Sequence, residues 1–185
     1  MAADSDESLL FACGRGDSSA LEQLFDRHSE VVWRFLSRML SRASPDVDDL
    51  VQQTFIELWR AAARFRGGSS AQVFILGIAH NLARAHLRKR SRRQALDRVL
   101  DLLPIPRPKP LDEAVDHHRL VGRVAEGLAA LSVEQRTAFL LVDLEGMRSA
   151  DAAQTLGVNQ GTFGRRLFEA RRKLRSLLED GGSSR

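Results

Sequence analysis

The sequence predicts an all-α protein: two small helical domains joined by a proline-rich flexible linker, the second domain containing a helix-turn-helix. Apolar residues recur at spacings of three and four along most of the chain, and no stretch shows the sustained apolar–polar alternation typical of strands. Four of the five prolines fall between residues 104 and 110, where they remove backbone donors and disfavour helix at each preceding residue. We therefore predict a first domain at residues 8–95, a linker at 96–116 and a second domain at 117–180.

The first domain is predicted to be helical throughout. Its first long amphipathic pattern places on one face Leu21, Leu24, Phe25, His28, Val32, Phe35, Leu36 and Met39. Ser44, Pro45 and Asp46 then break the chain and cap a second helix, with Pro45 near its first turn. A loop follows at residues 66–70. A third helix begins near Ala71 and runs into the basic segment 88–93.

The second domain is predicted to contain four helices. The first runs from about residue 120 to residue 131, and Ser132 with Gln135 three residues later forms a capping box that starts the next one. That second helix stops at Gly146. A short helix from Ser149 to Leu156, a tight turn at 157–159 and a long helix at 160–178 then make a helix-turn-helix.

The last helix combines a buried stripe with a basic surface. Its spacing predicts that one face is formed by Phe163, Leu167, Ala170, Leu174 and Leu177. Off that stripe lie Arg165, Arg166, Arg171, Arg172, Lys173 and Arg175, opposed only by Glu169. A helix that packs on one side and exposes cations on the other has the properties needed to bind the DNA major groove.

Charge is divided unevenly along the chain. The net charge is +4, but residues 84–98 alone carry +6 and residues 164–185 carry +4, while residues 1–83 and 99–163 each carry −3. Two basic patches on a mildly acidic background indicate two separate contacts with a polyanion.

Several function classes are disfavoured. Cys13 is the only cysteine, which excludes an intrachain disulfide and a cysteine zinc cluster, and we expect it to be a small residue of the first helix. The adjacent His117 and His118 point in different directions on a helix and do not make a metal site. We expect no enzymatic activity, metal or cofactor. With no apolar tract near ~18 residues and no signal-peptide pattern, we expect a cytoplasmic protein without membrane insertion of its own.

Three segments, at residues 48–70, 74–93 and 131–178, together resemble an extracytoplasmic-function (ECF) sigma factor, the small two-domain branch of the bacterial RNA polymerase sigma family. The resemblance implies that the first domain binds core RNA polymerase and melts the minus-ten promoter element. It implies that the second domain binds the minus-thirty-five element as duplex. The family is typically inhibited by an anti-sigma factor, which we therefore expect as a further partner.

The resemblance also implies roles for individual residues. The polymerase-binding helix carries Asp49, Leu50, Gln52, Gln53 and Phe55. The candidates for minus-ten DNA are Arg66, Ser69, Phe74, Asn81, Arg84, Arg88, Lys89 and Arg90. The candidates for minus-thirty-five DNA are Arg148, Gln160, Thr162, Arg165, Arg166 and Arg171.

Four positions depart from the family pattern. Gln53 stands in place of a common glutamate, and Gly164 in place of a frequent lysine. Phe74 replaces the usual tryptophan, and Ala71 a frequent aromatic residue. If either of these last two faces DNA, base stacking is weaker here; if both are core residues, only packing changes.

Two other functions remain open from the residues themselves. The first is an operator-binding helix-turn-helix regulator that acts as a dimer without polymerase. The second is a non-catalytic adaptor that titrates another regulator and binds no DNA. Two basic patches, each closing one half of the chain, favour the sigma-factor hypothesis over both.

Overall fold

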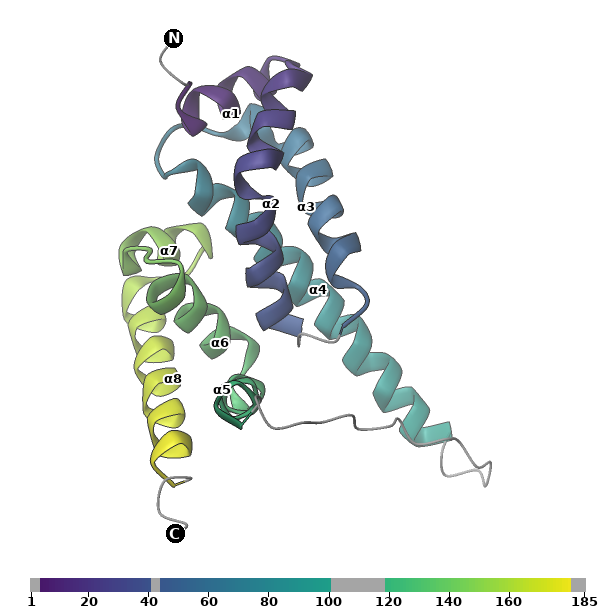
Figure 1. Ribbon diagram of the computed structural model, residues 1–185, viewed down its shortest axis with the longest axis vertical. Helices are drawn as coiled ribbons and strands as arrows, with labels where there is room; N and C mark the ends of the chain where they lie inside the picture. The colour runs from purple at the N-terminus through teal and green to yellow at the C-terminus, as the bar shows by residue number, and fades with distance from the viewer. Residues whose placement is uncertain (1–3, 41–43, 101–118, 181–185) are drawn as a thin grey trace.

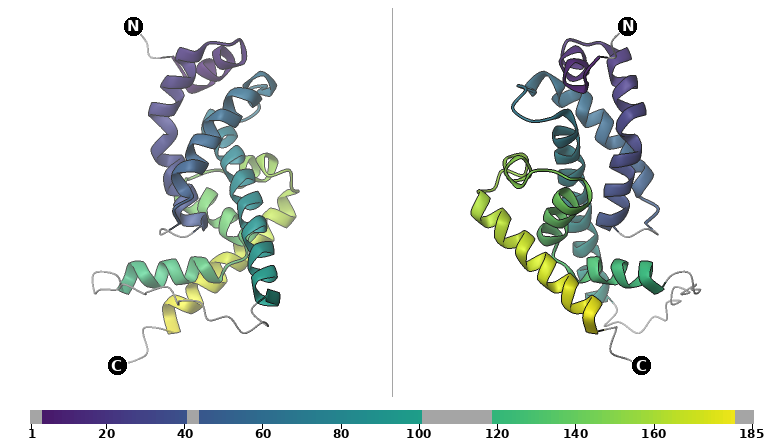
Figure 2. Two further views of the ribbon diagram at one scale, coloured as in Figure 1. Left: turned by 90° about the vertical axis from the view of Figure 1, so that its right-hand side faces the viewer. Right: turned by 60° about the vertical axis from the view of Figure 1, so that its left-hand side comes forward.

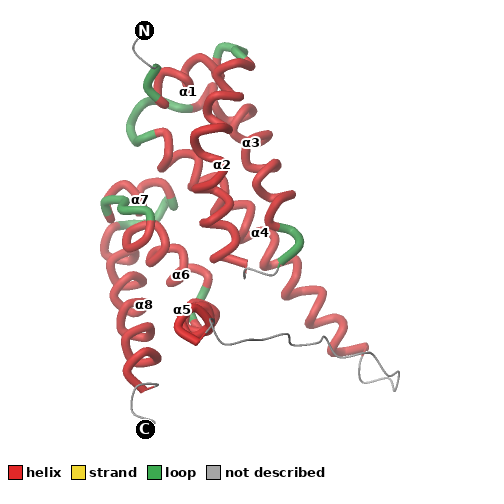
Figure 3. The backbone as a smooth tube through the Cα atoms, viewed as in Figure 1, coloured by secondary structure: helices red, strands yellow, loops and turns green. Residues whose placement is uncertain are grey.

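The structure, a computed structural model, describes residues 4–40, 44–100 and 119–180. Over these residues it contains helices, turns and loops and no strand (Figure 1; Figure 3). The predicted all-α fold class is confirmed. Among the described helices, none is long and apolar enough to cross a membrane.

The first domain packs three long helices and one short one around a leucine-rich core. They are α1 (Asp6–Gly14), α2 (Ser18–Leu40), α3 (Val47–Ala61) and α4 (Ala71–Leu100), with a 3₁₀ turn, η1 (Ala62–Arg64), after α3. Leu10, Leu24, Leu36, Leu58 and Leu76 are almost completely buried in this core. Asp46 precedes α3 as predicted, but its side chain makes no capping hydrogen bond.

The end of α4 lies beyond the predicted domain boundary. The helix continues to Leu100, five residues into the segment predicted as linker. The remainder of the predicted linker, with the proline run, lies outside the described residues, as do His117 and His118.

The second domain follows the predicted order of helices. It comprises α5 (Arg119–Ala130), α6 (Val133–Phe139), a π-helical turn η2 (Leu140–Leu144), α7 (Ser149–Thr155) and α8 (Gln160–Asp180). Both hydrogen bonds of the predicted capping box form between Ser132 and Gln135. Gly157, in the turn between α7 and α8, has a φ of 64°, a left-handed conformation that glycine adopts without steric cost.

The two domains contact each other along α4 and the end of α2 (Figure 2). The Arg136 guanidinium donates a hydrogen bond to the Met39 carbonyl, and His80 Nδ1 lies 3.1 Å from Thr137 Oγ1. Gly77 sits where α7 approaches most closely, because a Cβ there would lie 2.4 Å from Thr155 Cγ2. The buried residues of both domains thus form one continuous core.

The buried His80 makes this domain contact sensitive to pH. Burial, together with the charges of Arg84 and Arg166, lowers the pKa of His80 to about 4, and the charge of Glu134 opposes this shift. Because the folded pKa is depressed below 6.5, the stabilisation is complete above about pH 6.5 and is lost as the pH falls toward 4. We expect a loss of about 2 kcal/mol between about pH 7.5 and about pH 5.

Thermal unfolding at the two pH values measures this effect. His80→Gln should show a smaller fall in Tm than the wild type over this pH range. Equal pH dependence in wild type and His80→Gln would contradict the assignment.

Candidate nucleic-acid interface

Helix α8 has the predicted division between a buried and a basic side. Phe163, Leu167, Ala170 and Leu174 are buried against the rest of the second domain. Leu177 was predicted to continue the stripe and does not, since 44% of it is exposed. Its Cδ1 lies 4.0 Å from the position that a Cβ on Gly127 of α5 would take.

Three arginines of the predicted minus-thirty-five set are held by carboxylates of the same domain. Arg165 Nε lies 2.9 Å from Glu169, Arg171 makes two hydrogen bonds to Asp143, and Arg148 makes two to Asp151. The Asp143 hydrogen bonds raise the pKa of Arg171. All three arginines are exposed, and surface ion pairs contribute little stability. A DNA phosphate or base edge can therefore replace these carboxylates at small cost.

The remaining members of this set lie at the start of α8. Gln160 and Thr162 are exposed in its first turn. Asn159, predicted only as part of the turn, caps the helix by accepting a hydrogen bond from the Thr162 backbone N–H at 2.7 Å. Arg166 differs from its neighbours because it is half-buried and close enough to His80 to affect its pKa.

The loop of the first domain lies over an aromatic cluster. Gly67, in the loop, has a φ of 73°. Arg66 donates hydrogen bonds to the backbone carbonyls of Ala63 and Phe65, and Ser69 is half-buried. Beneath the loop, the Phe74 ring packs edge-on against Phe65 at 5.2 Å.

The structure resolves the ambiguity at Ala71 and Phe74. Ala71 is fully buried, so the absence of an aromatic residue there is a matter of core packing. Phe74 is partly buried and packs against the core cluster. Neither side chain is presented as an exposed platform for a base.

The basic surface of the first domain follows α4. Asn81, Arg84, Arg88, Lys89 and Arg90 are all exposed on this helix. Arg84 Nε lies 3.9 Å from Glu134 of the second domain, so part of this surface faces the other domain. Further along, a shallow hollow is lined by Ala85, Arg88, Lys89, Arg92 and Arg93.

The predicted polymerase-binding residues divide between surface and core. Asp49 and Gln52 are exposed on α3, while Leu50 and Gln53 are half-buried, with Gln53 donating to Glu57. Phe55 is 4% exposed and packs edge-on against Phe25 at 4.8 Å, so it supports this surface from below.

Sequence reasoning missed three exposed apolar residues on the same two helices. Phe25, Trp33 and Ile56 are each 40% exposed or more. The Trp33 indole N–H donates to Asp48, which ties α2 to the start of α3. Exposed apolar side chains rimmed by polar ones mark a protein-binding surface. Phe25 lies on the apolar stripe of α2, which had predicted that it was buried.

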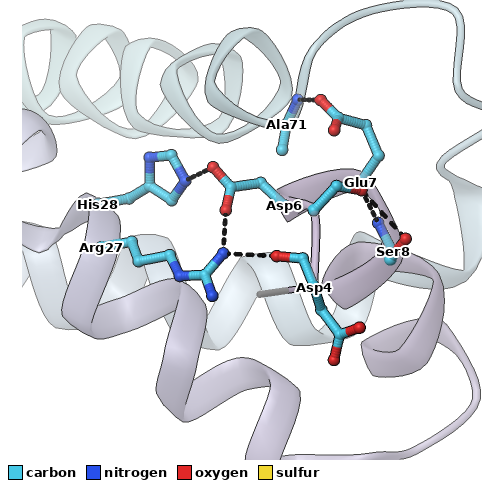
Figure 4. Close-up of polar contacts among 8 residues, drawn as sticks. Asp4, Asp6, Glu7, Ser8, Arg27, His28 and Ala71 are labelled. Carbon is cyan, nitrogen blue, oxygen red and sulfur yellow. Dashed lines mark hydrogen bonds and ion pairs between the residues drawn. The ribbon is translucent and has the colours of Figure 1, made fainter. Parts of the chain in front are cut away.

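Sequence reasoning also missed the polar contacts of α1 (Figure 4). Asp6 accepts a hydrogen bond from Arg27 at 2.7 Å and lies 2.8 Å from His28 Nε2, both on α2. Burial raises the pKa of Asp6, but the hydrogen bonds from Arg27 and His28 outweigh it and hold the pKa below its usual range. The Glu7 side chain points toward α4 instead and accepts a hydrogen bond from the Ala71 backbone N–H at 3.1 Å.

The described residues contain neither a candidate metal site nor an exposed thiol. No group of three or more histidine, cysteine or acidic side chains is placed to hold a metal ion within them. Cys13 is buried in the core, and burial raises the pKa of its thiol, which makes it unreactive.

These features define a two-domain DNA-binding protein, with a basic helix on the first domain and a helix-turn-helix on the second. Residues 24–93 match the Sigma-70 region 2 family model, and residues 122–174 match Sigma-70 region 4. The ECF RNA polymerase sigma factor SigM of Mycobacterium tuberculosis is 35% identical over 94% of this chain and 85% of its own length. The chain therefore belongs to the ECF sigma factors, which are non-catalytic subunits of RNA polymerase.

Two solved structures share the fold. One is CnrH in complex with the cytosolic domain of CnrY, with a TM-score of 0.69 and 28% identity over 96% of this chain and 99% of that one. The other is the sigma factor RpoE of Bartonella quintana in complex with the anti-sigma factor NepR, with a TM-score of 0.67 and 26% identity over 89% of this chain and 98% of that one.

Proposed function

We propose that this sigma factor docks on core RNA polymerase through the exposed face of α2 and α3 and binds two promoter elements with its two basic surfaces. The observation that carries the proposal is the separation of those surfaces: one follows α4 of the first domain, and the other follows α8 of the second. A regulator that binds one operator has no need of two such surfaces on different domains.

Each surface suits a different form of DNA. On α8, Arg165, Arg166 and Gln160 lie near the start of a helix that follows a tight turn, where side chains reach base edges in the major groove. On the first domain, the loop at 66–70 leads into α4, and Asn81 lies on that helix one turn before the exposed Arg84. A polar loop beside a phosphate-binding helix suits an unpaired strand, which is held by its backbone and read at its bases.

Binding both elements requires the domains to separate. Elements centred about 25 base pairs apart lie about 85 Å apart along the duplex. In the structure Arg84 of the first domain faces Glu134 of the second, and Met39 contacts Arg136. We infer that polymerase and promoter favour an open arrangement in which Arg84 exchanges Glu134 for DNA.

We also propose that an anti-sigma factor stabilises the closed arrangement and that the protein acts in the cytoplasm, where RNA polymerase works. Support comes from the solved relative bound to the anti-sigma factor NepR, whose fold this chain shares over most of its length. A partner that binds both domains at once would keep Arg84 against Glu134 and withhold it from DNA.

In vitro transcription tests the proposal. Purified core RNA polymerase is combined with a library of upstream fragments from the source genome, with and without the protein. The expected result is discrete new start sites that share two spaced upstream motifs. If the protein alone binds duplex DNA tightly and core polymerase adds no transcripts, the operator-binding function is favoured; if it binds neither DNA nor polymerase, the adaptor is.

Arg166→Ala separates base recognition from polymerase binding. If Arg166 makes a bidentate contact to guanine, its loss should weaken promoter binding by about 1–3 kcal/mol and leave core binding unchanged. Holoenzyme binding is measured on promoters with an intact or a scrambled minus-thirty-five element. An equal loss on both would assign Arg166 to a phosphate instead.

A further inference from the structure

We propose that helix α1 is a positioning element for minus-ten recognition: Glu7 fixes the start of α4, and Phe11 forms the floor of the loop at residues 66–70. The proposal rests on the proposed function of that loop. It concerns residues outside the matched family segment, which begins at residue 24.

Glu7 satisfies a backbone donor where the loop becomes a helix. Its carboxylate accepts from the N–H of Ala71, the first residue of α4, at 3.1 Å. Ser70 Oγ accepts from the Val73 N–H at 3.3 Å. Two backbone N–H groups in the first turn of α4 are therefore satisfied by side chains, one from α1 and one from the loop itself. A carboxylate at this position also interacts favourably with the helix dipole. The last loop residue and the direction of α4 are thereby fixed from a helix 64 residues earlier in the chain.

Phe11 supports the loop one turn further along α1. Its ring lies 5.2 Å from Phe65, which lies 5.2 Å from Phe74, so the three rings form a continuous cluster below the loop. Phe11 Cζ is 3.6 Å from the position that a Cβ on Gly67 would take. Phe11 also remains 42% exposed, whereas Phe65 is buried. It is thus an aromatic surface beside the loop in a chain that has no tyrosine.

Other contacts fix α1 itself, which a positioning role requires. Asp6 holds it to Arg27 and His28 of α2, and Arg27 also donates to the Asp4 carbonyl (Figure 4). At the other end, a Cβ on Gly14 would lie 3.1 Å from the Ala62 carbonyl oxygen, so glycine permits the close approach of α1 to η1. Between these two anchors, Glu7 and Phe11 sit at i and i+4 and share one face of the helix.

The consequence concerns strand opening. A loop that captures an unpaired base must keep its shape without DNA, because every residue that orders on binding weakens the interaction. Loss of the Glu7 hydrogen bond removes one of the two side-chain acceptors that satisfy backbone N–H groups at the end of the loop. We therefore expect α1 to affect opening of duplex promoters more than binding of polymerase.

Glu7→Leu, Glu7→Gln and Phe11→Ala test this on a promoter found in the transcription assay. Glu7→Leu removes the oxygen that accepts the hydrogen bond from the Ala71 N–H, whereas Glu7→Gln keeps an amide oxygen that can accept it. Permanganate reactivity of unpaired thymines measures opening in the holoenzyme. We expect Glu7→Leu to reduce opening about fivefold, the factor given by loss of one helix cap, and Glu7→Gln to stay within about twofold of the wild type. Phe11→Ala should also reduce opening.

Three controls keep the outcome unambiguous. Glu126→Leu, which changes an exposed glutamate of α5 outside the proposed binding surfaces, should open promoters like the wild type. Because the loop must still capture the unpaired bases, Glu7→Leu should also bind less tightly to a template already unpaired at the minus-ten element, while core binding should be unchanged. Normal opening by both Glu7→Leu and Phe11→Ala would overturn the proposal. If the wild type directs no promoter-specific transcript at all, the proposed function fails instead.

Discussion

Phe163→Ala should unfold or severely weaken the second domain while leaving the first domain folded. Phe163 is completely buried at the start of α8, in the middle of the helix-turn-helix. Replacing a buried phenylalanine by alanine costs about 3–5 kcal/mol, because apolar contact is lost and a cavity remains. That is a large part of the stability of a small domain. The expected result is loss of minus-thirty-five recognition with core binding through the first domain retained.

The same helix supplies a matched control. Phe168 lies five residues after Phe163 and is 67% exposed, so Phe168→Ala makes the same chemical change on the surface. Its unfolding free energy should differ from the wild type by no more than about 0.5 kcal/mol. Chemical denaturation followed by circular dichroism, with promoter binding measured in parallel, compares the two variants. Similar losses in both would show that α8 is not packed by the face containing Phe163.

Local sequence signals predicted the helices of the second domain. The Ser132–Gln135 capping box formed as expected because both of its hydrogen bonds join residues only three apart. The turn at Gly157 was visible because its left-handed conformation favours glycine. The buried stripe of α8 followed from helical periodicity, except that 44% of Leu177 is exposed. Periodicity shows which face is apolar and not how far the neighbouring helix covers it.

Contacts between distant parts of the chain left no such signal. Glu7 and Ala71 are 64 residues apart, and Thr137 and His80 are 57 apart. In the sequence Glu7 is one more acid in a polar N-terminus, and Gly77 is one more small residue in a helix. The close approach of Thr155 to Gly77, which decides how the domains pack, depends on the position of a helix that periodicity cannot place.

The candidate polymerase-docking residues show again that periodicity in the sequence does not reveal which apolar residues are buried. Phe25 and Phe55 both occupy helical stripes, yet Phe55 is buried and Phe25 is 40% exposed. An apolar stripe can contain both buried core residues and exposed residues that bind another protein. Only the packing of the folded structure distinguishes the two. Phe25, Trp33 and Ile56 therefore extend the candidate docking face proposed around Asp49 and Gln52.

Removing the basic run of α4 should weaken promoter binding in a salt-dependent way. Arg88, Lys89 and Arg90 are consecutive and exposed, and they precede Arg92 and Arg93. If each of the three binds one phosphate of an unpaired strand, the triple alanine variant should lower the slope of log affinity against log salt by about 2. At about 0.15 M salt the same counterion release corresponds to a loss of about 50-fold in affinity. Holoenzyme binding to promoter DNA across a salt series measures both quantities.

The expected loss of affinity depends on where the charges lie and not on how many are removed. A second triple variant, Arg15→Ala with Arg34→Ala and Arg60→Ala, removes the same net charge from the residue after α1 and from α2 and α3. Arg34 and Arg60 are paired with Glu30 and Glu57 on their own helices. A protein attracted to DNA only by its overall charge would lose equal affinity in both variants. A protein that binds phosphates along α4 should keep nearly its full salt slope in the second variant, because DNA-bound counterions are displaced only by cations that touch the strand.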